Sequence, residues 1–178
     1  MIRNAVTGDL RRLWEIDRIC FEPGIAYTRG QLRRFFELPG AECLVSEEGG
    51  VIDGFALGYS GGHDLAHVVT LDVLPTARRR GIGRGLLEAL LKRLASAGAR
   101  RPILEVDVRN AGAIAFYRRL GFRETGRIES YYGPGLDAYE MVREIPDPRT
   151  PGRASRRSPA ATDAGAAASG IRRPPREG

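Results

Sequence analysis

The sequence predicts an α/β domain built around one mixed β-sheet, and three observations support this fold class. Segments with the period of strands alternate with segments that have the period of helices, from Ile2 to Ile145. The runs ECLVSE and VIDGFALGY flank the turn sequence EEGG, which indicates an antiparallel hairpin. The later run AHVVTLDVL is mostly apolar and β-branched, as expected of a strand covered on both faces. The predicted order is β-α-α-β-β-β-α-β-α-β-β.

A short strand over residues 2–6 and two helices open the chain. Thr7 or Asp9 can cap the first helix, whose apolar residues follow the three-four spacing of an amphipathic helix. Thr28, followed three residues later by Gln31, predicts a capping box at the start of the second helix. The hairpin and the long apolar strand follow.

Residues 78–91, RRRGIGRGLLEALL, predict a helix that begins in an unusual way, since glycine costs about 1 kcal/mol relative to alanine inside a helix. Its apolar residues form one stripe for packing on the sheet: Ile82, Leu86, Leu87, Leu90, Leu91 and Leu94. The first amide groups of a helix lack intrahelical partners, and an anion could approach them closely at Gly81, Gly83 and Gly85. The segment therefore predicts a pyrophosphate site with arginines at its rim, although it matches neither the Walker nor the Rossmann pattern.

The strand ILEVDV places two carboxylates on one face of an otherwise apolar segment. Alternation puts Glu105 and Asp107 on the face opposite Leu104 and Val106. They could serve in proton transfer, or they could form ion pairs with nearby arginines. After the strand, Asn110 can cap the helix AGAIAFYRRL, and Gly121 occupies a C-terminal cap position. FRETGRIES and LDAYEMVREI are then expected to pair across the loop YYGPG.

The positive charge of the chain is concentrated in its last segment. The net charge is +6, and residues 146–178 contribute +4 of it from seven arginines and three acidic residues. This Pro-, Ala- and Arg-rich segment has one branched apolar residue, Ile171, so we expect a disordered basic tail after a domain over residues 1–145. The tail could touch RNA or the ribosome weakly, or it could have no function. The nearly balanced domain does not predict a nucleic-acid-binding protein.

The remaining composition argues for an intracellular protein without a metal. Cys20 and Cys43 show no CxxC spacing and are expected to be small buried side chains in a reducing, cytoplasmic compartment. The N-terminus lacks the apolar core of a signal peptide, and no apolar run is long enough to span a membrane. His63 and His67 have no partners at metal-ligand spacing, so no metal is predicted.

Two linked motifs resemble the GNAT acetyltransferase superfamily. The segment Arg78-x-x-Gly81-x-Gly83 follows a strand, and LEVDVRNAGAIAFYRRLGF follows it after about twenty residues. The second segment matches the family pattern at Asn110, Ala113, Tyr117, Gly121 and Phe122. The resemblance covers residues 1–145 and implies a GNAT fold, acetyl-CoA as acetyl donor and a primary amine as acceptor.

Within the superfamily, LEV, the following RN and AIAFY, and the later SYY are most similar to the RimI group, which acetylates the N-terminal α-amine of a small-subunit ribosomal protein. The resemblance implies that Glu105 acts as general base through water and that Tyr117 protonates the coenzyme A thiolate. It places the backbone of Leu71, Asp72 and Val73 against the pantetheine arm and the acetyl group. The other implied cofactor contacts are Arg79, Arg80, Gly81, Ile82, Gly83, Arg84 and Asn110, and the implied acceptor contacts are Tyr131, Tyr132 and Tyr27.

One departure leaves the acceptor open. RimI proteins have a Phe-Pro-Trp-like segment before the second helix, whereas this chain has FEPGIAYTRGQL without tryptophan, where Tyr27 could partly substitute. Three functions follow: acetylation of a protein N-terminus, acetylation of a small-molecule amine, or a non-catalytic RNA- or ribosome-binding module that uses the tail. Tyr117 could also be a packed aromatic residue, and Tyr131 and Tyr132 could be exposed rings at a turn.

Overall fold

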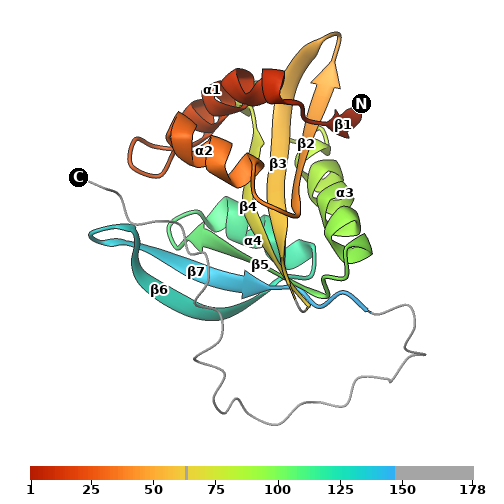
Figure 1. Cartoon of the computed structure of the whole chain (residues 1–178). Helices are drawn as coiled ribbons and strands as arrows, with labels where there is room; N and C mark the ends of the chain where they lie inside the picture. Colours follow the sequence, from red (N-terminus) through yellow and green to blue (C-terminus); the bar gives the residue numbers. More distant parts are fainter. Residues whose placement is uncertain (63, 147–178) are drawn as a thin grey trace. The chain divides into compact units, whose positions relative to one another are not determined.

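The computed structural model describes residues 1–62 and 64–146, and Met1–Asp147 form one compact unit. Its strands form a single sheet with the order β1-β2-β3-β4-β5-β7-β6, in which β4 and β5 are parallel and the other described pairs are antiparallel (Figure 1). The tail predicted from residue 146 lies, apart from Pro146, outside the described residues.

The elements follow the predicted order. The strands are β1 (Ile2–Asn4), β2 (Ala41–Glu48), β3 (Val51–Gly62), β4 (Leu65–Val73), β5 (Arg101–Asp107), β6 (Arg123–Gly133) and β7 (Leu136–Val142). The helices are α1 (Leu10–Cys20), α2 (Arg29–Phe36), α3 (Ile82–Ser96) and α4 (Ala111–Arg119), with 3-10 turns η1 (Thr7–Asp9) and η2 (Pro75–Ala77). None of these described helices combines the length and the apolar character needed to cross a membrane.

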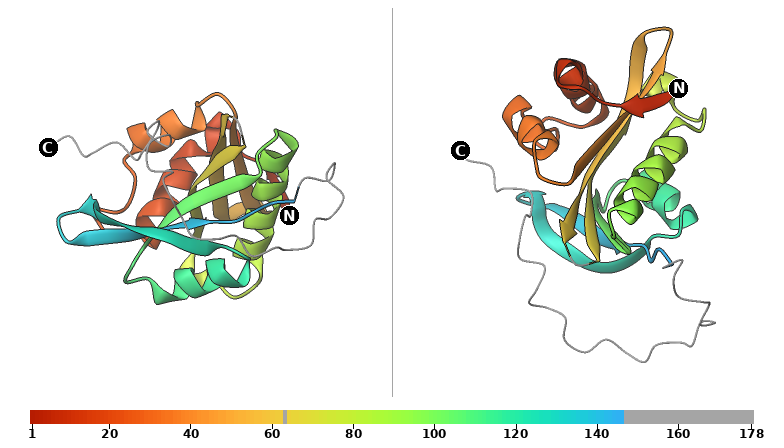
Figure 2. Two further views of the ribbon diagram at one scale, coloured as in Figure 1. Left: turned by 90° about the horizontal axis from the view of Figure 1, so that it is seen from below. Right: turned by 45° about the vertical axis from the view of Figure 1, so that its right-hand side comes forward.

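Helices cover both faces of the sheet. The right-hand view of Figure 2 shows α1 and α2 on one side, here called the α1/α2 face, and α3 on the other, here called the α3/α4 face. Burial of a leucine side chain stabilises the fold by about 1.5–3 kcal/mol. The predicted stripe of α3 is confirmed, because its leucines are buried in the core of the α3/α4 face: Leu86, Leu87, Leu90, Leu91 and Leu94.

The predicted start and end signals act locally as expected. The backbone N–H of Gln31 donates to Thr28 Oγ1 at 3.2 Å, and the Thr28 N–H donates to Gln31 Oε1 at 3.0 Å, which confirms the capping box. Asn110 Oδ1 accepts from the Ala113 N–H at 3.0 Å at the start of α4. Gly121 follows α4 with a φ of 84°, a left-handed conformation that glycine adopts without strain.

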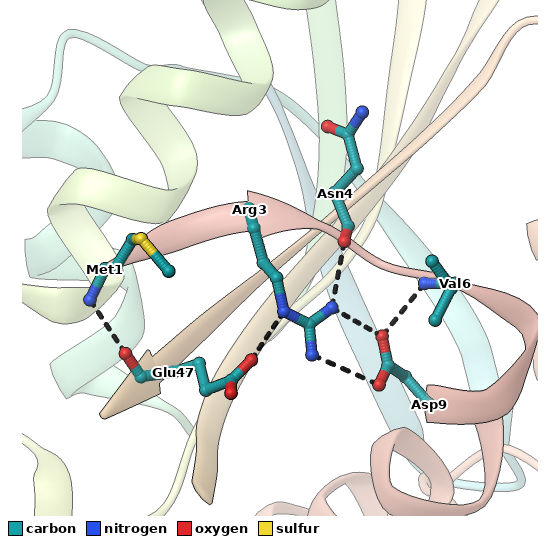
Figure 3. A network of polar contacts seen from close by, with 6 residues as sticks. All are labelled: Met1, Arg3, Asn4, Val6, Asp9 and Glu47. Carbon is teal, nitrogen blue, oxygen red and sulfur yellow. Dashed lines mark hydrogen bonds and ion pairs between the residues drawn. The ribbon is translucent and has the colours of Figure 1, made fainter. Parts of the chain in front are cut away.

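Asp9, one of the two expected caps, is the N-cap residue of α1 but makes no side-chain capping bond, and Thr7, the other, lies in the preceding turn η1. Asp9 accepts no hydrogen bond from α1; its carboxylate accepts the Val6 N–H at 2.9 Å and pairs with Arg3 at 2.7 Å (Figure 3). Arg3 also pairs with Glu47 of β2 at 2.5 Å. A charged partner outweighs a neutral backbone donor, so Asp9 joins the N-terminal strand to the turn before α1 instead of capping that helix.

The expected position of the two adjacent tyrosines is also corrected. Tyr131 and Tyr132 lie within β6, whereas the turn to β7 is formed by Pro134 and Gly135. Four residues of β6 opposite Asp137 are out of register with β7, which is an irregularity that sequence alternation does not reveal. The tyrosines therefore belong to a strand, and their direction is set by its distortion.

Candidate active site

The parallel strands β4 and β5 separate at the centre of the sheet. They pair only where Leu65–His67 faces Arg101–Ile103, and beyond this point the edge of β4 has no neighbouring strand (Figure 1). The register between β3 and β4 also shifts at Val69, whose carbonyl accepts from the Tyr27 hydroxyl at 3.3 Å. We call this region the β4–β5 divergence. Its unpaired β4 edge can bind an extended ligand through backbone groups.

A histidine and a glutamate meet at the β4–β5 divergence on the α1/α2 face. His67 Nε2 lies 2.6 Å from Glu105 Oε2, and the two side chains are 9% and 13% exposed. Within the described residues His67 Nδ1 is buried without a hydrogen-bond partner. Because a carboxylate only accepts, Nε2 carries the hydrogen of this bond. The alternative predicted for Glu105, an ion pair with arginine, is therefore replaced by a pair with His67.

The surroundings of Glu105 determine its charge. Burial by itself would raise the pKa of this carboxyl group, but the His67 hydrogen bond, the His67 charge interaction and the Tyr131 hydroxyl together bring the pKa below its usual value. The Tyr132 hydroxyl donates to the Glu105 backbone carbonyl at 3.3 Å. The side chain is thus a carboxylate at neutral pH in a nearly water-free position, where it can accept a proton.

A row of aromatic rings leads to His67 on the same face. The ring centroids of Tyr27 and Phe35 are 5.5 Å apart, those of Phe35 and Tyr59 are 6.5 Å apart, and those of Tyr59 and His67 are 5.6 Å apart. Tyr27 is buried, and its N–H donates to Asp17 of α1 at 2.6 Å. Tyr27, which was expected to contact the acceptor amine, is therefore part of the core. It holds the segment between α1 and α2 and offers little surface to an acceptor.

Tyr117 lies on the opposite side of the sheet from Glu105. It belongs to α4, is partly buried against the α3/α4 core, and makes edge-on contacts with the rings of Phe116 at 5.3 Å and Phe122 at 5.8 Å. Burial and the nearby charge of Asp72 raise the pKa of its phenol above the usual value. Tyr117 is thus packed as expected of an aromatic residue, and it also places a protonated hydroxyl group on the α3/α4 face.

The start of α3 resembles an anion site only in part. Gly81 has a φ of 83° with open space around it, and no side chain caps the helix. A Cβ on Gly83 would touch Val73 and Phe116 at 3.6 and 3.8 Å, so this glycine also lets the helix approach β4 and α4. Gly85 has a different role from the one expected, because a Cβ there would lie 3.3 Å from Ile2 of β1. The open amides therefore lie around Gly81.

The arginines near this helix start have partners of their own. Arg80 pairs with Glu48 at 2.6 Å and Arg84 with Glu88 at 2.9 Å, and all four side chains are exposed. Arg78 Nε donates to the Val73 carbonyl at 3.0 Å, which fixes the segment to the end of β4. Exposed ion pairs contribute about 0–1 kcal/mol, so exchange of their carboxylates for a phosphate costs little.

The remaining predicted residues are divided between the faces of β4 and the end of β5. Leu71 and Val73 pack toward the α3/α4 core, whereas Asp72 is buried on the other face and accepts from the Thr70 hydroxyl at 2.6 Å. Asp107 makes the expected ion pair, since Arg109 Nη2 lies 2.6 Å from its carboxylate. Cys43 is buried as expected, but Cys20 is only partly buried and donates to the Val73 carbonyl at 3.3 Å.

Sequence reasoning missed the role of His67. A single histidine in the mostly apolar run AHVVTLDVL is a weak signal, and its partner Glu105 is 38 positions away. His63, the other histidine considered, lies outside the described residues. Within the described part of the chain, no three His, Cys, Asp or Glu side chains gather as metal ligands would.

Comparison with known proteins identifies the family. Residues 10–122 match the model of the acetyltransferase (GNAT) family. The chain belongs to the GNAT family. This GNAT chain is 33% identical over 155 residues to an N-alpha-acetyltransferase of Sulfurisphaera tokodaii, a match that covers 79% of this chain and 90% of that protein. It is also 33% identical over 146 residues to the N-alpha-acetyltransferase RimI of Mycobacterium tuberculosis, again covering 79% of this chain and 90% of that protein.

A solved structure shows the same GNAT fold. The ribosomal-protein-S18-alanine N-acetyltransferase of Escherichia coli superposes with a TM-score of 0.74 at 25% identity, covering 85% of this chain and 99% of that chain. The predicted fold and enzyme class are confirmed, and this GNAT chain is an N-acetyltransferase. The non-catalytic RNA-binding module is set aside.

Proposed function

We propose that this GNAT enzyme transfers the acetyl group of acetyl-CoA to the N-terminal α-amine of a protein in the cytoplasm, with a ribosomal protein as its acceptor. The observation that carries the proposal is the Glu105–His67 pair at the β4–β5 divergence, with Tyr117 on the other face. The relatives named N-alpha-acetyltransferase support the choice of acceptor. The ribosomal acceptor is supported by the Escherichia coli structure.

The residues around the divergence fit acetyl-CoA. The unpaired edge of β4 at Leu71, Asp72 and Val73 offers backbone groups to an extended amide-bearing arm. The uncapped amides near Gly81 and Ile82, with Gly83 behind them, suit a pyrophosphate, since the helix dipole favours negative charge there. Asn110 and three arginines complete the proposed contacts: Arg79, Arg80 and Arg84. Acetyl-CoA supplies an activated thioester carbonyl.

Glu105 is the proposed general base. Its carboxylate is charged at neutral pH and shielded from water, and the His67 hydrogen bond fixes its orientation. An α-ammonium group has a pKa near ~8, compared with ~10.4 for lysine, so less driving force is needed to remove its proton. Transfer through a water molecule brings that proton to Glu105, which passes it on to the solvent. The free amine attacks the thioester carbonyl, the carbon–sulfur bond breaks to release the thiolate, and the second proton of the nitrogen follows the same route.

Tyr117 is the proposed general acid. Its raised pKa keeps the phenol protonated until a thiolate forms beside it. Donation costs more than from an unperturbed phenol, whose pKa of ~10 is already above the ~8.5 of a thiol. The partly buried setting offsets this, because a thiolate is also destabilised where water is excluded.

The acceptor can be tested directly. We expect peptides with a free N-terminus to be acetylated at their α-amine, whereas the same peptides with a blocked N-terminus and a free lysine should not react. Mass spectrometry of the products identifies the modified nitrogen. Turnover of free amino acids or polyamines alone would instead favour the second candidate, a small-molecule acetyltransferase, for which the absence of tryptophan from the segment FEPGIAYTRGQL is the supporting observation.

The catalytic roles are tested by two substitutions. Removal of a general acid or base typically lowers the rate by a factor of about 10²–10⁴, so Glu105→Gln and Tyr117→Phe should each lower kcat by at least ~10². Calorimetric titration should show that both variants still bind acetyl-CoA. Glu124→Gln, on the exposed edge of β6, is the matched control. Full activity of either catalytic-site variant would contradict its assigned role.

A further inference from the structure

The irregular segment of β6 lies directly opposite one residue of β7. Ile128 pairs with Ala138, and the next pair is Gly133 with Leu136. Between these pairs β6 has four residues and β7 has only Asp137. Extra residues in one strand bend it and redirect its side chains, and such bulges are common beside active sites. Asp137 is therefore the only ladder position that faces the distorted segment.

The Asp137 carboxylate binds one residue just before the irregular segment of β6 and one residue within it. Its Oδ1 accepts from the Ser130 N–H at 2.8 Å, and its Oδ2 accepts from Arg127 Nε and Nη2 at 2.8 and 2.6 Å. The Asp137 backbone carbonyl accepts from the Val108 N–H at 3.2 Å, just beyond the end of β5. The carboxylate is 15% exposed and its pKa is lowered, first by the Ser130 N–H and then by Arg127. The carboxylate is thus charged and bound by Ser130 and Arg127, while Val108 holds the Asp137 backbone.

Ser130 has a backbone conformation that needs such support. Its φ is 51°, in the left-handed region that a residue with a side chain rarely adopts. Strained residues of this kind persist where surrounding contacts over-determine them, and they are concentrated at functional sites. Ser130 directly precedes the two tyrosines that contact Glu105.

The direction of these tyrosines follows from the bulge. In a regular strand Tyr131 and Tyr132 would point to opposite faces. Here the Tyr131 hydroxyl stabilises the Glu105 carboxylate, the Tyr132 hydroxyl reaches the Glu105 carbonyl, and the two rings are in edge-on contact at 4.8 Å. We propose that Asp137 is a positioning residue for the acceptor, which holds Ser130 in its left-handed conformation and thereby directs both tyrosines to Glu105. This inference rests on the proposed function and extends it to acceptor specificity.

The test is the Asp137→Ala variant in the full chain. A misplacement of about 1 Å near the reacting groups can cost ~10² in rate, so we expect kcat/KM for the acceptor peptide to fall tenfold or more. The Kd for acetyl-CoA should stay within about twofold, because the donor contacts lie on β4, α3 and α4. Ser130→Gly should retain activity, since glycine adopts a positive φ without strain. Glu124→Ala, which removes an acid of β6 that pairs with Arg118 of α4, is the matched control.

Two further measurements separate the possible outcomes. If Asp137 acts through the two tyrosines, adding Asp137→Ala to the variant that carries both Tyr131→Ala and Tyr132→Ala should lower acceptor kcat/KM no further. Hydrogen exchange read by mass spectrometry should show loss of protection in residues 129–132 of Asp137→Ala only, even if the wild-type enzyme acetylates no α-amine. A wild-type enzyme that acetylates no α-amine would reject the proposed function, but the exchange measurement would still show whether Asp137 supports the irregular segment of β6. Unchanged acceptor kcat/KM, or an equal loss of acetyl-CoA affinity, would overturn the positioning role.

Discussion

Glu105 is held on the α1/α2 face of β5, where burial by itself would favour the neutral carboxylic acid. His67 reverses this tendency with a hydrogen bond of 2.6 Å, and the Tyr131 hydroxyl adds to it. A single histidine in a mostly apolar strand is usually a packed core side chain, and His67 is packed against Tyr59. Its contact with Glu105 makes the same side chain part of the charge balance of the site.

Removal of His67 is expected to change the pH dependence of the enzyme. In His67→Ala the burial of Glu105 loses its main opposing interaction, so the pKa of Glu105 should rise and the base should be protonated at higher pH. The ratio of variant to wild-type kcat/KM, measured from about pH 4 to 9, cancels the ionisation of the acceptor amine and should fall as the pH is lowered. His67→Gln, which restores a donor, should recover part of the ratio. A ratio that does not vary with pH would contradict this role.

At the scale of elements, the site depends on how closely β3 supports β4. A Cβ on Gly58 would lie 2.7 Å from the His67 carbonyl oxygen, and a Cβ on Gly54 would lie 2.8 Å from the Asp72 carbonyl oxygen. Both contacts involve backbone atoms, which cannot turn aside as a flexible side chain can. Gly54 thus lets β3 approach the part of β4 that no longer pairs with β5, and Gly58 lets it approach His67, the last residue of β4 that still does.

Two alanine substitutions compare this close approach with a glycine in open space. Gly58→Ala should lower the free energy of unfolding by about 1–3 kcal/mol, because β4 must shift at His67. Gly30→Ala in α2, where nothing lies within 4 Å of the added Cβ, should raise it by up to about 1 kcal/mol. Urea unfolding measures both values, and acetyl transfer should weaken only in Gly58→Ala. Equal stability changes would show that β3 and β4 are not closely fitted.

At the scale of the whole molecule, ion pairs bind distant parts of the chain to the sheet. Arg3 joins β1 to Asp9 before α1 and to Glu47 of β2 (Figure 3). The pKa of the Asp9 carboxyl group is lowered, first through its hydrogen bond with Arg3 and against the effect of burial. The pKa values of Glu105, Asp107 and Asp137 are lowered as well. Each of these groups binds a proton less readily in the folded state than in the unfolded state.

The stability of the fold should therefore decline in acid. A carboxylate with a lowered folded-state pKa contributes its full stabilisation above the unfolded-state value of about 3.9–4.3, and this is lost as the pH falls through the folded-state pKa. Urea unfolding between about pH 2 and 7 should show a plateau near neutrality and a fall below ~pH 4. Asp9→Asn should be less stable on the plateau and approach the wild type in acid. A constant difference at all pH values would contradict the linkage, and Glu37→Gln, at an exposed helix pair, is the control.

The sequence by itself determined the order of elements, the caps at Thr28, Asn110 and Gly121, and the apolar stripe of α3. Each of these depends on residues within a few positions of one another, so periodicity and local hydrogen bonding are sufficient to predict it. The motif LEVDVRNAGAIAFYRRLGF also pointed to the family before any geometry was available. Asp9 is the N-cap residue of α1, but the side-chain bond expected of it does not form, because Arg3 on the neighbouring strand offers its carboxylate a charged partner.

Only the tertiary structure decided which side chains meet at the site. His67 and Glu105 are 38 positions apart, and they touch because β4 and β5 run parallel and in one particular register before they separate. Tyr131 and Tyr132 both reach Glu105 because Asp137 faces a bulge that no period in the sequence signals. A shift of one residue in a strand moves its side chains to the other face, so strand register and bulges, which long-range packing sets, determine the geometry around Glu105.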